Sequence, residues 1–232
     1  MNYELDHPEI RHAVSKLCAD FPGTYWQKCD RENSYPSAFV AALTEAGYLA
    51  ALIPEKFGGL SLPLSAAAAI LEEIHRSGGN AAACHAQMYT MGTLLRHGSE
   101  TQKAQYLPDV ASGALRLQAF GVSEPSSGTD TTSLKCTARR EGDTYVINGQ
   151  KIWTSRAEHS DLLVLLARTT PRDQVAKKTQ GLSVFLVDMR DVLGSSLSIR
   201  PIRTMMNHAT TELFFDEMPV PAANLIGEEG QG

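Results

Sequence analysis

Apolar residues recur at helical spacing through the first half of the chain. A first helix is predicted to follow Asp6 as its N-cap, with Pro8 in the first turn, and to end at residues 21–23. A second helix is predicted to begin near residues 34–36. Gly47 closes it as the residue after the C-cap, a position that favours glycine.

Three further helices are predicted before residue 114. Leu64–Arg76 is rich in alanine with a buried apolar face, and Ala81–Arg96 carries Met88 and Met91, which we interpret as core residues. Ser99 and Gln102 have the spacing of a capping box, with the serine as N-cap and the glutamine at N3. They predict a last helix, which Gly113 closes.

From Ala114 onward the apolar period changes to that of strands. Leu115–Val122 is predicted to be a strand, and Asn148-Gly149 is predicted to be the turn of a tight hairpin. The continuous apolar run Leu162–Ala167 indicates a strand that is buried on both faces, and Thr169–Gln180 is predicted to be an exposed loop. Further strands are predicted at residues 181–188, 197–200 and 212–215.

These patterns predict an α+β protein with two domains. Residues 1–113 form an all-α helical domain, and residues 114–232 form an antiparallel β-barrel or sandwich. The 232 residues, of which 43% are hydrophobic and 20% charged, suit such a globular chain.

Charge and composition narrow the function classes. The net charge is −5 and the lysines and arginines form no basic stripe, so nucleic acid is not expected as a partner. The sequence has no apolar run of membrane-spanning length and no secretory signal, and we expect a cytoplasmic protein with reduced thiols. The four cysteines contain no Cys-x-x-Cys pair and the histidines are dispersed, so no metal site is predicted.

Two segments carry candidate chemistry. The loop at residues 123–130 is dense in Ser, Thr and Gly, whose hydroxyl and backbone N–H groups suit phosphate oxygens. Trp153 is an aromatic residue with Thr154 and Ser155 beside it. An ordinary loop and a core tryptophan are the plainer interpretation of the same residues.

The amino-acid sequences of these two segments resemble the motifs of a known protein family. Residues 120–130 read Phe-Gly-Val-Ser-Glu-Pro-Ser-Ser-Gly-Thr-Asp, and residues 148–155 read Asn-Gly-Gln-Lys-Ile-Trp-Thr-Ser. Together they resemble the flavin-binding middle-domain signature of the acyl-CoA dehydrogenases, in the same order and spacing. Residues 53–60 and 97–113 also resemble the N-terminal domain of that family, with Phe57 near its acyl pocket.

The resemblance implies a set of FAD-binding positions. Phe120, Val122 and Ser123 would approach the flavin ring, and Trp153 would pack against it. Ser155 would hydrogen-bond near N5 or O4 of the ring. Thr154 is counted with the cofactor-binding residues, as are Gly128 and Thr129 beside the pyrophosphate. Thr129 would also touch the CoA side of the substrate.

The resemblance further implies α,β-dehydrogenation of an acyl-CoA, with hydride passing to flavin N5. In the family the base comes from a C-terminal helical bundle that these residues do not supply, so no catalytic residue is predicted here. Glu124 is expected to shape its loop and Asp130 to cap it. An electron-transfer flavoprotein and a homo-oligomer are the partners implied.

Two other functions are compatible with the same sequence. One is that of a truncated or non-catalytic fragment that binds flavin or a partner, and the other is that of a relative with oxidase or monooxygenase chemistry. The polar cluster at residues 203–208 is either a solvated strand end or a contact to CoA or a neighbouring subunit.

Overall fold

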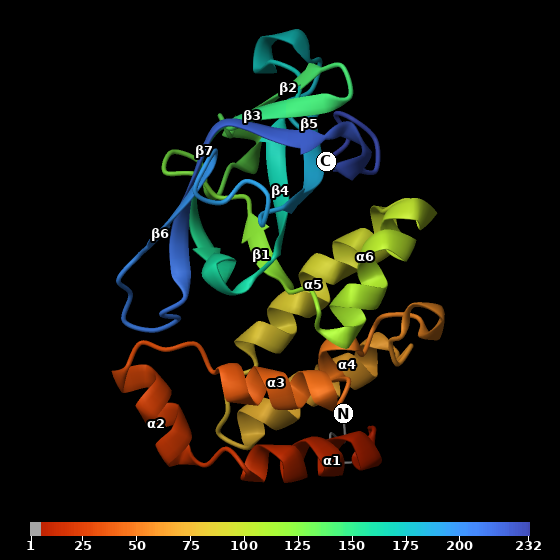
Figure 1. Cartoon of the computed structure of the whole chain (residues 1–232), viewed down its shortest axis with the longest axis vertical. Helices are drawn as coiled ribbons and strands as arrows, with labels where there is room; N and C mark the ends of the chain where they lie inside the picture. The colour runs from red at the N-terminus through yellow and green to blue at the C-terminus, as the bar shows by residue number, and fades with distance from the viewer. Residues whose placement is uncertain (1–5) are drawn as a thin grey trace. The chain divides into compact units, whose positions relative to one another are not determined.

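A computed structural model describes residues 6–232, in which α-helices come first along the chain and β-strands follow (Figure 1). The chain divides into two compact units. Of the described residues, the helical unit contains 6–95 together with Lys103–Leu115. The sheet unit contains Arg96–Gln102 and Arg116–Gly232. The described helices are α1 Pro8–Ala19, α2 Gly23–Arg31, α3 Ser37–Glu45, α4 Leu64–Arg76, α5 Ala82–His97 and α6 Glu100–Ser112.

The helical unit has its own apolar core. Helix α4 keeps the predicted bounds, and it buries Ile70 and Ile74 against the side chains that α1 contributes, Val14 and Cys18. An ion pair of 2.6 Å between Arg11 Nη2 and Glu72 Oε2 joins the same two helices at the edge of this core. Short alanine side chains allow the close approach of helices that such packing needs.

Helix ends show where local signals were sufficient and where they were not. The capping box is confirmed, because Ser99 Oγ accepts from the Gln102 backbone and Gln102 Oε1 accepts from the Ser99 backbone. Asp6 as the first N-cap is wrong. His7 occupies that position, since Pro8 is the first helical residue and the His7 carbonyl accepts the first helical bond. Helix α2 was not predicted at all.

The sheet unit holds eight strands in one sheet, in the order β6-β7-β3-β2-β4-β5-β8, with β1 paired to β4. Most pairings are antiparallel as predicted, but β1 and β2 each pair with β4 in parallel, so the sheet is mixed. The strands are β1 Leu117–Gly121, β2 Thr137–Glu141, β3 Thr144–Ser155, β4 Leu162–Arg168, β5 Leu182–Asp188, β6 Leu197–Pro201, β7 Thr210–Pro221 and β8 Leu225–Ile226.

The hairpin predicted at Asn148-Gly149 is wrong. Strand β3 runs straight through both residues, and the turn that joins β2 to β3 lies at Gly142-Asp143 instead. The register against β7 shifts between Ile147 and Gly149, which marks a bulge. Gly149 has a φ of 143°, and a Cβ there would lie 2.7 Å from Cys136 Cα. The Asn-Gly pair therefore serves a bulge and a close backbone approach.

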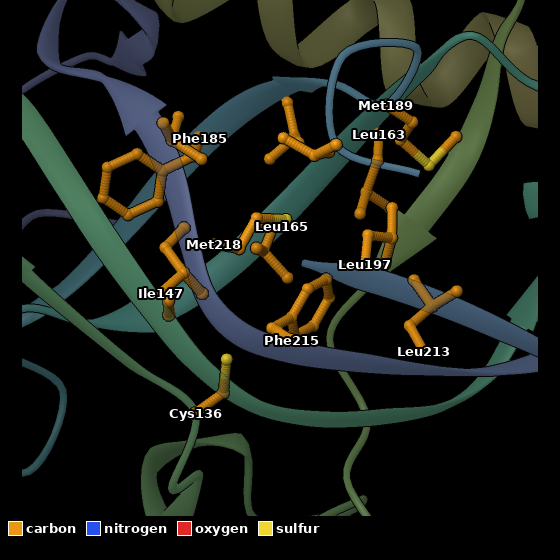
Figure 2. Close-up of a cluster of buried hydrophobic side chains, with 14 of the residues drawn as sticks. Cys136, Ile147, Leu163, Leu165, Phe185, Met189, Leu197, Leu213, Phe215 and Met218 are labelled. Atoms are coloured by element: carbon orange, nitrogen blue, oxygen red, sulfur yellow. The ribbon is translucent and has the colours of Figure 1, made fainter. Parts of the chain in front are cut away.

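A hydrophobic core lies between the strands of the sheet unit (Figure 2). Strand β4 contributes Leu163 and Leu165 to it, as expected for an apolar run that is almost wholly buried. Figure 2 shows their side chains directed toward residues of β3, β5, β6 and β7. The labelled members of this core are Cys136, Ile147, Leu163, Leu165, Phe185, Met189, Leu197, Leu213, Phe215 and Met218.

Gln102 belongs to the sheet unit through its side chain. Its Nε2 donates to the carbonyls of Ala223 and Leu225, each at 2.7 Å. Among residues 6–232, none of the helices combines the length and the apolar character that a membrane crossing requires.

Candidate functional site

A buried ion pair anchors the loop that follows β1. Lys151 Nζ lies 2.8 Å from Glu124 Oε1, and the two side chains are 0% and 4% exposed. Lys151 Nζ also donates to the Val122 carbonyl at 3.0 Å. The Glu124 carboxylate accepts from the backbone N–H groups of Lys135 and Cys136, at 2.6 and 2.9 Å. Both ends of the loop are therefore tied to one buried carboxylate, and Glu124 shapes the loop as expected.

One backbone hydrogen bond brings the two sequence motifs together. The Ile152 N–H donates to the Ser123 carbonyl at 2.9 Å. The residues that follow β1 therefore lie directly beside the C-terminal end of β3, although nearly thirty positions separate them in the chain. Ser123 accepts this bond, and Trp153 is the residue next to its donor, Ile152.

Large aromatic side chains stand at the surface on both motifs. Phe120 is 39% exposed and Trp153 is 58% exposed. The register of β3 shifts between Lys151 and Thr154, and Trp153 has a φ of 62°, in the left-handed region. A bulge of this kind redirects a side chain out of the ordinary strand alternation. Exposed aromatic rings beside half-buried serines suit a flat ligand with a polar edge.

Thr154 differs from its neighbours because it is fully buried. Its carbonyl accepts from Thr211 Oγ1 at 2.7 Å on the adjacent strand β7. Its own hydroxyl is buried without a hydrogen-bond partner among the described residues. The side chain lies beneath the surface that carries Trp153, while Ser155 is only half-buried.

Gly128 and Thr129 lie exposed at the tip of the loop. A Cβ added to Gly128 would meet nothing within 4 Å, so the packing of the chain itself does not require glycine there. Asp130 caps the short 3-10 helix Thr131–Ser133, as predicted, by accepting from the Thr132 backbone. Side-chain hydrogen bonds from Thr132 and Ser133 lower the pKa of Asp130 to about 2.

The polar segment at residues 203–208, which the sequence marked as a cluster, reaches the same site through Asn207. Asn207 Nδ2 donates to Ser155 Oγ at 2.8 Å. Arg156 Nη1 donates to Asn207 Oδ1 at 3.5 Å. The solvated-end interpretation still suits Met205 and Met206, which are largely exposed. The sequence marked Asn207 only as a member of this polar cluster and gave no sign of its contact with Ser155. Its φ is 58°, which asparagine tolerates better than most residues.

Within residues 6–232, no group of three or more His, Cys, Asp or Glu side chains is arranged to hold a metal ion. The four cysteines are free thiols, and burial raises the pKa of both Cys84 and Cys136 to about 12. The surface around Phe120 and Trp153 offers a ligand hydrogen-bond donors, exposed aromatic rings and open space beside the backbone of Gly128.

Two family models match the chain. Residues 4–114 match the acyl-CoA dehydrogenase N-terminal domain, and residues 119–218 match the acyl-CoA dehydrogenase middle domain. The chain belongs to the acyl-CoA dehydrogenase family. All the residues that form the surface around Phe120 and Trp153 lie within the stretch that matches the middle domain.

Named relatives agree with this assignment. The chain is 34% identical to a glutaryl-CoA dehydrogenase from Desulfococcus multivorans, over 97% of this chain and 57% of the relative. The structure of an acyl-CoA dehydrogenase from Geobacillus kaustophilus superposes with a TM-score of 0.88 at 29% identity, over 98% of this chain and 60% of that one. A glutaryl-coenzyme A dehydrogenase bound to glutaryl-CoA gives a TM-score of 0.87 at 29% identity, over 100% of this chain and 59% of that one. The chain thus spans less than two thirds of these relatives.

Proposed function

We propose that the sheet unit binds FAD on the surface formed by the two motifs. Phe120, Val122 and Trp153 would contact the flavin ring, and the hydroxyls of Ser123 and Ser155 would donate to its polar edge. The observation that carries the proposal is the hydrogen bond between Ile152 and Ser123, because it sets the two motifs side by side. Exposed aromatic residues next to hydroxyl donors suit this class of ligand.

The tip of the loop would receive the pyrophosphate of the same cofactor. Gly128 has open space where a Cβ would stand, and glycine at such a position lets a ligand approach the backbone closely. The exposed Thr129 adds a hydroxyl donor for phosphate oxygens and, by the same proposal, for the CoA part of a substrate. Thr154 would not contact the cofactor but would hold the backbone between Trp153 and Ser155, because its carbonyl accepts a hydrogen bond from Thr211 Oγ1.

The reaction class proposed is the α,β-dehydrogenation of an acyl-CoA thioester. When bound, FAD supplies the hydride acceptor. The part of this chain's residues is to bind and orient the ring and to present hydrogen-bond donors to it. The acyl-CoA substrate is proposed from the glutaryl-CoA that a relative binds. An electron-transfer flavoprotein as acceptor and a homo-oligomeric state are proposed with it.

Neither carboxylate of the motif loop is placed to act as the base. Glu124 is buried and already contacts Lys151 and two backbone N–H groups. Asp130 accepts hydrogen bonds from two neighbouring hydroxyls and one backbone N–H. Both carboxylates therefore support the loop, and a proton-abstracting group must come from elsewhere.

The direct test is a titration of the chain with FAD, followed by the change in flavin fluorescence. The Ser123→Ala, Ser155→Ala double variant removes both proposed donors. At about 1 kcal/mol for each hydrogen bond, we expect its Kd to rise about 30-fold. Ser198→Ala, an exposed serine on β6, is the matched control and should bind as the wild type does. Equal affinity of the double variant and the wild type would refute the assigned positions.

A further inference from the structure

We infer that Asn207 is a positioning residue that holds Ser155 as a hydrogen-bond donor toward a bound flavin. This inference rests on the proposed function. It begins from the 2.8 Å hydrogen bond in which Asn207 Nδ2 donates to Ser155 Oγ. Asn207 lies outside both sequence motifs, in the segment between β6 and β7.

The direction of this hydrogen bond follows from Arg156. A guanidinium group only donates, so the amide atom that faces Arg156 Nη1 must be the oxygen Oδ1. The amide nitrogen then faces Ser155 Oγ, and it can only donate. Both hydrogen bonds therefore run in one direction, from Arg156 to Asn207 and from Asn207 to Ser155.

That polarity fixes what Ser155 can do for a ligand. A serine hydroxyl can donate one hydrogen bond and accept two. Since Oγ already accepts from Asn207, its own proton is directed to another partner. With one acceptor position taken by Asn207, the Ser155 proton is the group left to point at a ligand acceptor, such as the unprotonated ring nitrogen or a carbonyl oxygen of oxidised flavin.

Several bonds hold Asn207 in the conformation that this role needs. Its φ of 58° lies in the left-handed region, which asparagine tolerates better than most residues. Its carbonyl accepts from Thr210 Oγ1 at 2.7 Å and from Thr204 Oγ1 at 3.3 Å. On the facing segment, the Arg156 N–H donates to the Ala209 carbonyl at 2.6 Å. The segment on both sides of Asn207 is thus fixed against the end of β3.

The first test is a double-mutant cycle on the FAD affinity of the full chain. Asn207→Gly removes the amide and still permits a positive φ, and Ser155→Ala removes the hydroxyl. We expect each single variant to raise the Kd about fivefold and the double variant to raise it by no more than Ser155→Ala alone. Effects that multiply to about 25-fold would show that Asn207 does not act through Ser155, and would overturn the inference.

The second test reverses the polarity. Asn207→Asp keeps the size of the side chain but replaces the donor by an acceptor, so the Ser155 proton turns toward the new carboxylate. We expect a larger loss of FAD affinity than Asn207→Gly causes, with a changed visible spectrum of the residual bound flavin. Asn33→Asp is the control, because Asn33 is exposed and also has a positive φ, and it makes the same change of charge. Wild-type affinity in Asn207→Asp would contradict the inference.

A third measurement needs no flavin. The side-chain amide signals of Asn207 in a ¹H–¹⁵N correlation spectrum should shift in Ser155→Ala, because a hydrogen bond to Nδ2 is lost. Unchanged signals would overturn the inference by themselves. If the wild-type chain takes up no FAD, the proposed function fails, and this comparison alone decides whether Asn207 fixes the polarity of Ser155.

Discussion

The buried pair of Lys151 and Glu124 supports a quantitative prediction about stability. Lys151→Met removes the ammonium group and keeps a side chain of similar length. Glu124 would then remain buried with only the two backbone N–H groups of Lys135 and Cys136 as partners. The Val122 carbonyl would also lose its donor.

The cost follows from the burial of both groups. Removing one partner of a buried ion pair leaves an uncompensated charge and typically destabilises a protein by about 3–5 kcal/mol. In a protein of this size, about 1 kcal/mol corresponds to a shift in Tm of about 2–4 °C. We therefore expect Lys151→Met to lower the Tm of the chain by about 6–20 °C.

Thermal unfolding followed by circular dichroism measures the effect, with Arg139→Met as the control. Arg139 Nη2 lies 2.6 Å from Glu141 Oε1, but both side chains are more than half exposed. An exposed pair of this kind contributes about 0–1 kcal/mol, so the control should move the Tm by only a few degrees. Adding Glu124→Gln to Lys151→Met should recover part of the loss, because the buried charge is removed. Equal small shifts in Lys151→Met and the control would show that the buried pair of Lys151 and Glu124 contributes no more than an exposed pair.

Three further predictions concern the loop and the thiols. Gly128→Ala should leave the Tm unchanged and weaken FAD binding, since a Cβ there meets no protein atom within 4 Å; a lowered Tm would contradict this. The pKa of Asp130 is about 2 in the folded state and about 3.9 when unfolded, so its ionised form stabilises the fold above about pH 4. That stabilisation is lost as the pH falls toward 2, and in acid titrations Asp130→Asn should lack this part of the decline. In the native chain at pH 8, a thiol reagent should modify Cys29 first, because the other three cysteines are buried, and peptide mass mapping identifies the modified residue.

Much of the fold could be predicted from local patterns. Leu64–Arg76 could be predicted from its helical apolar period, and the strand that begins at Leu162 from its continuous apolar run. The capping box at Ser99 worked because its two hydrogen bonds lie within four residues. Helix α2 was missed because it is only nine residues long and none of its residues is fully buried, although Tyr25 and Trp26 pack against the core of the helical unit.

Long-range pairing explains the principal error. Asn148-Gly149 satisfies the local rule for a hairpin turn, but the asparagine side chain bonds to Glu217 on β7, and the glycine lies against Cys136. Neither partner can be identified from residues near 148. The choice between a turn and a bulge was therefore made by tertiary contacts.

In the candidate site, too, some features follow from local sequence and others depend on tertiary contacts. The two motifs could be found from their amino-acid sequences. The hydrogen bonds that Glu124 and Asp130 accept agree with their expected roles in shaping and capping the loop. The burial of Thr154 depends on a bulge beside Trp153, which periodicity alone would not place. Asn207 lies some fifty residues from Ser155, and only the pairing of β3 with β7 brings them together.

We propose that the surface around Phe120 and Trp153 holds a flavin. The most direct measurement is the visible absorption spectrum of the purified chain after incubation with FAD and removal of unbound cofactor. We expect the absorption bands of oxidised flavin at close to one FAD per chain, with a marked loss in the Ser123→Ala, Ser155→Ala double variant. A colourless chain that is folded by circular dichroism would contradict this proposal.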